Sequence, residues 1–135
     1  MPRLDRAEYE TLAEFRYQIL KFLRFSERAA RAQGLNSRQH QLLLALSGLP
    51  AGVRPTIGAL AERLQLRHHS AVGLIDRLAD AGFVVRAADP ADHRRTLVRI
   101  TPHGGAVLRR LTRIHRDELD TAGPRLLEAL HNVLR

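Results

Sequence analysis

Residues 56–101 contain two short helical patterns followed by two short β-rich runs, and this order constrains the fold more than any other part of the chain. Apolar side chains recur at helical spacing over 56–64 and 67–82. Two runs rich in β-branched residues then flank a charged, proline-containing loop at 89–95, which is typical of a hairpin. Helix, turn, helix and hairpin together predict a winged helix-turn-helix, with the wing at 83–101.

Helical patterns also flank this segment on both sides. Asp5 and Glu8 have the spacing of a capping box, and the helix that they open is expected to end near Gly34. Thr101-Pro102 has the residue types of an N-cap and a first helical position. We expect the helix that follows to break at Gly123-Pro124, because proline lacks a backbone N–H and clashes with the preceding turn.

The length of 135 residues is typical of one domain, which we divide into two regions. Residues 36–101 are the expected winged-helix region, and residues 5–33 and 102–135 are the expected terminal helices. The terminal helices carry more apolar positions than a small winged-helix region can cover, so unpaired they would leave a large exposed patch. We therefore predict a mostly α fold with a small β-hairpin wing, whose terminal helices form a dimerisation region.

The composition limits the possible partners and chemistries. The chain has 22 Lys and Arg against 14 Asp and Glu, and Lys21 is its only lysine. Arginine has a planar guanidinium that suits phosphates and guanine edges. The lack of cysteine excludes disulfides and thiol redox sensing. Because neither an apolar run of ~18 residues nor an apolar signal core is present, we expect a cytoplasmic protein without a membrane partner.

The helix predicted at 67–82 has an apolar and a polar face. We expect the inward stripe to consist of Val72, Ile75, Leu78 and Ala79. The N-terminal residues of a recognition helix meet base edges in the major groove of DNA. The expected DNA-contacting residues lie on the opposite face and in the first turn: Arg67, His68, His69, Ser70, Gly73 and Arg77.

Two residues on this helix have open alternatives. Gly73 lacks a side chain, which would let the helix approach the groove closely, but a tolerated helix glycine costing about 1 kcal/mol would look the same. Leu74 either packs under the wing or meets a thymine methyl group, and we favour packing.

The wing loop pairs a carboxylate with an arginine. Asp92 precedes Arg94 by two residues, so its carboxylate can brace that guanidinium. A narrow A·T minor groove concentrates negative potential and attracts an inserted arginine. We expect Arg94 there, with Arg95 and Arg86 near phosphates. The alternative is an ordinary charged hairpin with a surface ion pair of little energetic value.

These features resemble those of the MarR-type winged-helix transcriptional regulators. The similarity covers nearly the whole chain, including both terminal regions. It rests on three sequences: Thr56-Ile-Gly-Ala-Leu-Ala-Glu-Arg-Leu64, His69-Ser-Ala-Val-Gly-Leu-Ile-Asp-Arg-Leu78, and Asp89-Pro-Ala-Asp92-His-Arg94-Arg95 with Leu97-Val-Arg-Ile-Thr-Pro102-His-Gly104. The resemblance implies that Arg94 enters the minor groove with Asp92 as its brace, and that His68, His69, Ser70 and Gly73 face bases.

The chain departs from the family pattern at two places. Many members have Thr-Arg where this chain has Gly73-Leu74, and Arg67 replaces a small capping residue. A specific operator sequence therefore cannot be transferred from the family.

The resemblance further implies a homodimer on double-stranded DNA with an inverted-repeat operator, and a small aromatic or phenolic effector in a cleft. Arg16, Tyr17 and His40 are candidate effector-binding residues, although core packing explains them equally well. We expect no cofactor and no metal site, because no local ligand spacing is shown by His40, His93, His103, His115 and His131.

The favoured interpretation is a homodimeric repressor that an effector releases from its operator. The alternative is a non-specific DNA-binding or DNA-compacting protein, which would use the same basic surface without sequence preference. An enzyme is not expected, because Glu62, Asp76, Asp80 and His115 do not form an acid-base or nucleophile motif by spacing.

Overall fold

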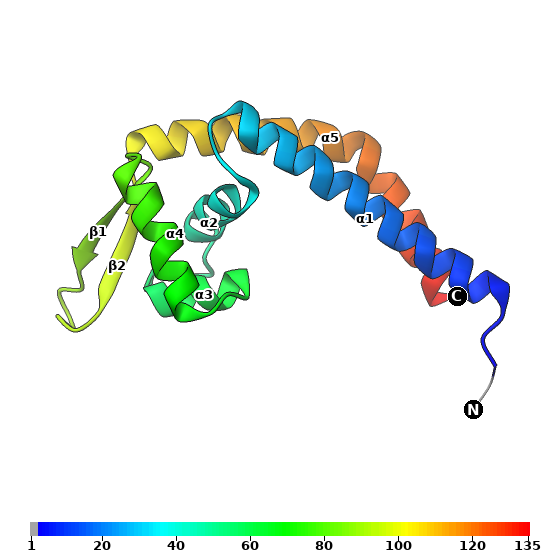
Figure 1. The fold of residues 1–135 in the computed structure, drawn as a ribbon, viewed down its shortest axis with the longest axis horizontal. Helices are drawn as coiled ribbons and strands as arrows, with labels where there is room; N and C mark the ends of the chain where they lie inside the picture. The colour runs from blue at the N-terminus through cyan, green and yellow to red at the C-terminus, as the bar shows by residue number, and fades with distance from the viewer. Residues whose placement is uncertain (1–2) are drawn as a thin grey trace.

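The computed structural model describes residues 3–135 and contains five helices and one two-stranded antiparallel sheet in that range. The elements in chain order are α1 (Arg6–Ala32), α2 (Ser37–Ser47), α3 (Ile57–Leu64), α4 (His68–Asp80), β1 (Val84–Ala88), β2 (Thr96–Ile100) and α5 (Pro102–Leu134). The two longest helices, α1 and α5, lie side by side and form an arm (Figure 1). The remaining elements form a winged-helix lobe at one end of it, so the predicted fold class is confirmed.

Side chains cap the predicted helix starts. Asp5 and Asn36 each form a complete capping box, with Glu8 and Gln39 respectively. The Thr101 hydroxyl accepts a hydrogen bond from the Gly104 N–H at 3.0 Å, which caps α5. These bonds satisfy backbone donors that a helix start otherwise leaves unpaired, so the sequence signals at Asp5 and Thr101 located the starts of α1 and α5 correctly.

The break expected at Gly123-Pro124 is wrong, because α5 is continuous and contains Pro124. A proline inside a helix costs about 3 kcal/mol or more, which an isolated helix of this length would not offset easily. Beyond Pro124 the helix still packs along α1, and Ala129 is buried there. Packing against α1 therefore keeps α5 helical across Pro124.

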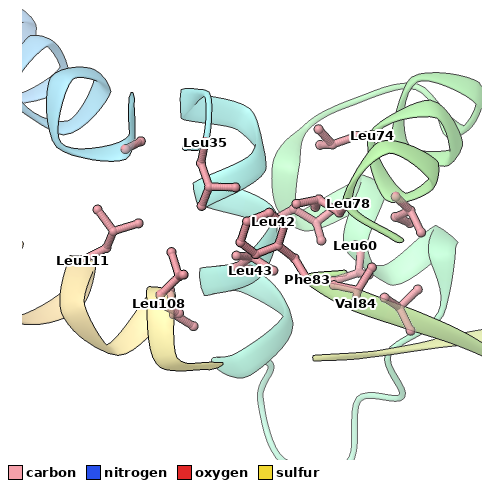
Figure 2. Packing of buried hydrophobic residues seen from close by; sticks show 14 residues of the cluster. Leu35, Leu42, Leu43, Leu60, Leu74, Leu78, Phe83, Val84, Leu108 and Leu111 are labelled. Atoms are coloured by element: carbon pink, nitrogen blue, oxygen red, sulfur yellow. The ribbon is translucent and has the colours of Figure 1, made fainter. Parts of the chain in front are cut away.

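The core joins the winged-helix lobe to the start of the arm. Figure 2 shows Leu108 and Leu111 of α5 directed towards α2, where Leu42 and Leu43 are fully buried. On the far side of α2, residues from α3, α4 and the hairpin complete the cluster: Leu60, Leu74, Ile75, Leu78, Phe83, Val84 and Val98. The wing is thus attached to the core at its base.

A loop segment pairs with the outer edge of β2. The strands β1 and β2 pair with Val84 opposite Ile100 and Ala88 opposite Thr96. On its other edge, β2 receives a bridge between Leu97 and Thr56, and the Val98 N–H donates to the Pro55 carbonyl oxygen at 2.9 Å. The segment that leads into α3 is therefore held against the wing.

The inward stripe of α4 differs from the expected one. Its buried residues are Ala71, Leu74, Ile75 and Leu78. Val72 is only partly buried, because it lies about 100° around the helix from the centre of that stripe. Ala79 lies at a similar angle and is also partly buried. The predicted packing role of Leu74 is confirmed, since its side chain is only 5% exposed.

No helix within residues 3–135 combines the length and the apolar character that crossing a membrane requires.

Candidate nucleic-acid interface

The polar face of α4 is turned away from the core. Arg67, His68, His69 and Arg77 are exposed, and Ser70 and Gly73 are partly exposed. Within residues 3–135, Arg67 supplies no side-chain hydrogen bond to the start of the helix. The first backbone N–H groups of α4 therefore remain available to an anionic ligand such as a phosphate.

Gly73 is not required by packing inside the chain. A Cβ atom added at this position would meet no heavy atom of residues 3–135 within 4 Å, outside its own helical turn and chain neighbours. The helix is also regular there, so the backbone does not require glycine. The bare position therefore faces open space on the side that the sequence assigned to DNA.

Asp92 holds Arg94 at the tip of the wing. The Arg94 Nε and Nη2 atoms donate to the two carboxylate oxygens of Asp92 at 3.1 and 3.3 Å, and the Arg94 backbone N–H donates to the same group at 3.1 Å. The side-chain bond, then the backbone bond and the charge of Arg95 lower the pKa of Asp92. The Arg94 side chain is 91% exposed, so its remaining N–H donors point to solvent.

The predicted hydrogen bonding between Asp92 and Arg94 is thus present in the structure. Arg95 lies in the same turn, with its Nε atom 3.7 Å from Asp92. Asp92 is therefore shared between two arginines of the wing tip.

Arg86, which the sequence suggested as a phosphate contact, has a carboxylate as its partner within the chain. Its guanidinium pairs with the carboxylate of Asp76 on α4, and both side chains are about half exposed. This ion pair joins the wing to α4, so the two elements that were expected to contact DNA are linked directly.

Sequence reasoning missed Asp89 and Arg54. The Asp89 side chain is 1% exposed and accepts a hydrogen bond from Arg54, which lies in the loop before α3. It also accepts from the Ala91 N–H at 2.8 Å. The Asp-Pro dipeptide at the loop start was a turn signal, but it gave no indication of a distant arginine.

The three candidate effector residues lie in two different places. His40 is buried, with its ring centroid 4.8 Å from that of His115. Burial, and secondarily the charge of His115, lowers the pKa of His40 to about 4. The His115 Nε2 atom lies 2.8 Å from the Ser26 hydroxyl oxygen. Tyr17 precedes Ser26 by nine residues on α1, which is about 13 Å along the helix.

Tyr17 and Arg16 are exposed on α1, and Tyr17 lines a hollow of about 430 Å³. The other residues that line the hollow are apolar or basic: Leu20, Lys21, Arg24, Phe25 and Arg28. Neither His40 nor Arg16 lines it. The structure therefore does not gather the three candidates into one site.

A sequence model described as the MarR family matches residues 33–95. An HTH-type transcriptional regulator of Mycobacterium tuberculosis is 34% identical over 93 residues, which are 69% of this chain and 65% of that relative. The transcriptional activatory protein BadR of Rhodopseudomonas palustris is 34% identical over 89 residues, which are 65% of this chain and 51% of BadR. The chain thus spans less than two thirds of these relatives.

Two solved structures share the arrangement over most of their length. The transcriptional repressor CouR, bound to a 23-mer DNA duplex, superposes with a TM-score of 0.72 at 25% identity and covers 99% of this chain and 100% of CouR. AbsC, a MarR family transcriptional regulator from Streptomyces coelicolor, gives a TM-score of 0.77 at 20% identity over 90% of this chain and 82% of AbsC. The AbsC likeness supports the fold alone.

Proposed function

Since the chain belongs to the MarR family of winged-helix transcriptional regulators, we propose that it is a sequence-specific, DNA-binding regulator that acts as a homodimer. The observation that carries this proposal is the braced Arg94 on a wing that is tied to the exposed face of α4. A helix and a neighbouring exposed arginine, held together in this way, fit a major groove and the adjacent minor groove.

In the proposed complex, α4 lies in the major groove. His68, His69 and Ser70 stand at its N-terminal end, where base edges are within reach, and Gly73 allows a close approach. Arg94 enters the minor groove, with Asp92 as its brace. The basic residues around these two elements, Arg67, Arg77 and Arg95, bind the DNA backbone or neighbouring bases.

The proposed dimer is formed by the arm. Large apolar side chains are exposed along both of its helices, and Leu127 and Leu134 near the end of α5 are 71% and 74% exposed. The others on the arm, apart from Tyr17 and Leu20, which line the hollow on α1, are Tyr9, Leu12, Leu23, Leu119 and Leu130. A second copy would cover such a surface, because monomeric proteins rarely leave large apolar patches in water. The two-fold dimer would bind an inverted repeat with half-sites about one turn (~10 bp) apart.

We further propose that the protein represses transcription and that a small aromatic or phenolic effector releases it from DNA. CouR, which matches along the whole chain, is a repressor, whereas BadR is described as an activatory protein, so the sign of regulation needs its own test. The hollow beside Tyr17 combines aromatic and cationic side chains, which suits an aromatic anion. An effector that binds one dimer geometry better would shift the population away from the DNA-binding geometry.

Selection of duplexes from a random pool tests the central proposal. The purified protein should enrich an inverted repeat. The spacing of its half-sites should match the distance between the two α4 helices of one dimer. A pool that is bound but not enriched would favour the DNA-compacting alternative instead. The salt dependence of binding would not separate the two, since both neutralise phosphates.

A further inference from the structure

The wing turn is built around a carboxylate that is almost fully withdrawn from water. The Asp89 side chain is 1% exposed, and its Oδ1 atom accepts from Arg54 Nη2 at 2.5 Å and from the Ala91 N–H at 2.8 Å. Within residues 3–135, its second oxygen has no hydrogen-bond partner. A buried carboxylate is costly unless it is paired, so the position of this turn depends on the Arg54 guanidinium.

Backbone bonds carry this position to the wing tip. The Asp92 N–H donates to the Asp89 carbonyl oxygen at 3.2 Å, and the Asp89 N–H donates to the Arg95 carbonyl oxygen at 3.0 Å. Asp92 in turn holds Arg94 through two side-chain bonds. A continuous set of polar contacts therefore runs from Arg54 to Arg94.

The backbone next to Arg54 is held against β2. It immediately precedes Pro55, whose carbonyl oxygen accepts from Val98 on the outer edge of β2. Its side chain is 45% exposed, but its guanidinium is directed at Asp89 on the β1 side of the hairpin. The ion pair therefore crosses β2 and fastens the free end of the wing to the loop that leads into the helix-turn-helix.

We propose that Arg54 and Asp89 are positioning residues for DNA binding, whose ion pair sets the wing turn so that Arg94 is presented beside α4. This inference rests on the proposed function. It assigns Arg54 a role within the protein, although an arginine at the edge of a basic DNA-binding surface would ordinarily be expected to contact phosphate.

The variant Asp89→Asn separates these two roles by the sign of its effect. It keeps the shape of the side chain and raises the formal charge from +8 to +9, because one negative charge is removed. General electrostatics then predicts equal or tighter binding to DNA. Positioning predicts weaker binding, by about tenfold, within the roughly 5- to 150-fold range expected when a groove-reading arginine is lost.

The affinity is measured by fluorescence anisotropy on a labelled duplex that carries the inverted repeat selected by the parent protein. Asp89→Asn is measured alone and combined with Arg94→Ala. If Asp89 acts through Arg94, the additional loss in the Arg94→Ala background should be below about twofold, because the positioned group is already absent. Losses that multiply in full would overturn the positioning role.

Variants at Arg54 supply a second series, in case Asp89→Asn does not fold by circular dichroism. Arg54→Gln should weaken binding about as much as Asp89→Asn, and Arg54→Lys should restore part of the affinity because it can still pair with the carboxylate. Arg31→Gln is the matched control: it removes the same charge and breaks the exposed pair with Glu27 on α1. It should leave binding nearly unchanged.

The outcomes are distinguishable from those of the proposed function. If the parent selects and binds an inverted repeat but Asp89→Asn binds as well or better, the positioning role is refuted and the function stands. If Arg54→Gln and Arg31→Gln lose the same affinity, Arg54 acts only through its charge, which also refutes it. If the parent binds no duplex DNA at low salt, the proposed function falls, and this inference falls with it.

Discussion

Replacing Gly73 with alanine should stabilise the protein and weaken its binding to DNA. Alanine in a helix interior is favoured over glycine by about 1 kcal/mol, and the added Cβ meets no heavy atom within 4 Å among the residues described. For a chain of this length, 1 kcal/mol corresponds to a rise in Tm of roughly 3–5 °C. Because the same methyl group faces the expected DNA groove, it should cost about 1–2 kcal/mol of binding free energy through close contact.

The two effects are measured by thermal unfolding and by anisotropy on the selected duplex. Gly105→Ala is the matched control, because Gly105 also lies in a helix and a Cβ there also meets nothing within 4 Å in residues 3–135. It lies on α5, outside the expected DNA-contacting face, so it should gain stability without losing affinity. If Gly73→Ala gained stability and bound DNA as tightly as the parent, Gly73 would be an ordinary helix glycine and the close approach would be refuted.

Four further perturbations test other parts of the proposal. Arg94→Ala should weaken binding by roughly 1–3 kcal/mol in an anisotropy titration, and equal affinity would contradict the minor-groove role. His69→Ala should alter the motif selected from a random pool; an unchanged motif would remove His69 from base recognition. A chain that ends at Thr121 should sediment as a monomer, because it lacks the exposed Leu127 and Leu134. For His40, the pKa of about 4 in the fold lies below the unfolded value of 6.5, so stability is fully present above pH 6.5 and is lost as the pH falls towards 4. Urea unfolding near pH 7 and pH 4.5 should differ by roughly 2–3 kcal/mol in the parent and by much less in His40→Leu.

The elements that could be predicted from the sequence are those fixed by local chemistry. The capping residues Asp5 and Thr101 located helix starts, because their hydrogen bonds need only the next three residues. The Asp92–Arg94 brace was also predictable, since the two residues are two positions apart in one turn. Two runs rich in β-branched residues on both sides of a charged, proline-containing loop were sufficient to predict the wing.

The features that could not be predicted depend on contacts between distant parts of the chain. The helix continues through Pro124 because α1 packs beside it, and a local rule sees only the missing N–H. The burial of Asp89 depends on Arg54, which lies 35 residues earlier. Gly104 is a similar case: a Cβ there would collide with the Phe83 carbonyl oxygen, so its requirement comes from the approach of α5 to the wing base.

These long-range ties also limit how the proposed effector can act. The wing is joined to α4 by Asp76 and Arg86 and to the loop before α3 by Arg54 and Asp89. If both ties hold, the relative position of the wing and α4 changes little, so it is a poor target for regulation. In the proposed dimer, the arm would set the spacing between the two winged-helix lobes, and the hollow beside Tyr17 lies on α1 of that arm. An effector bound there would therefore act on the distance between the two winged-helix lobes of the dimer. It should weaken binding to the full inverted repeat far more than binding to a single half-site.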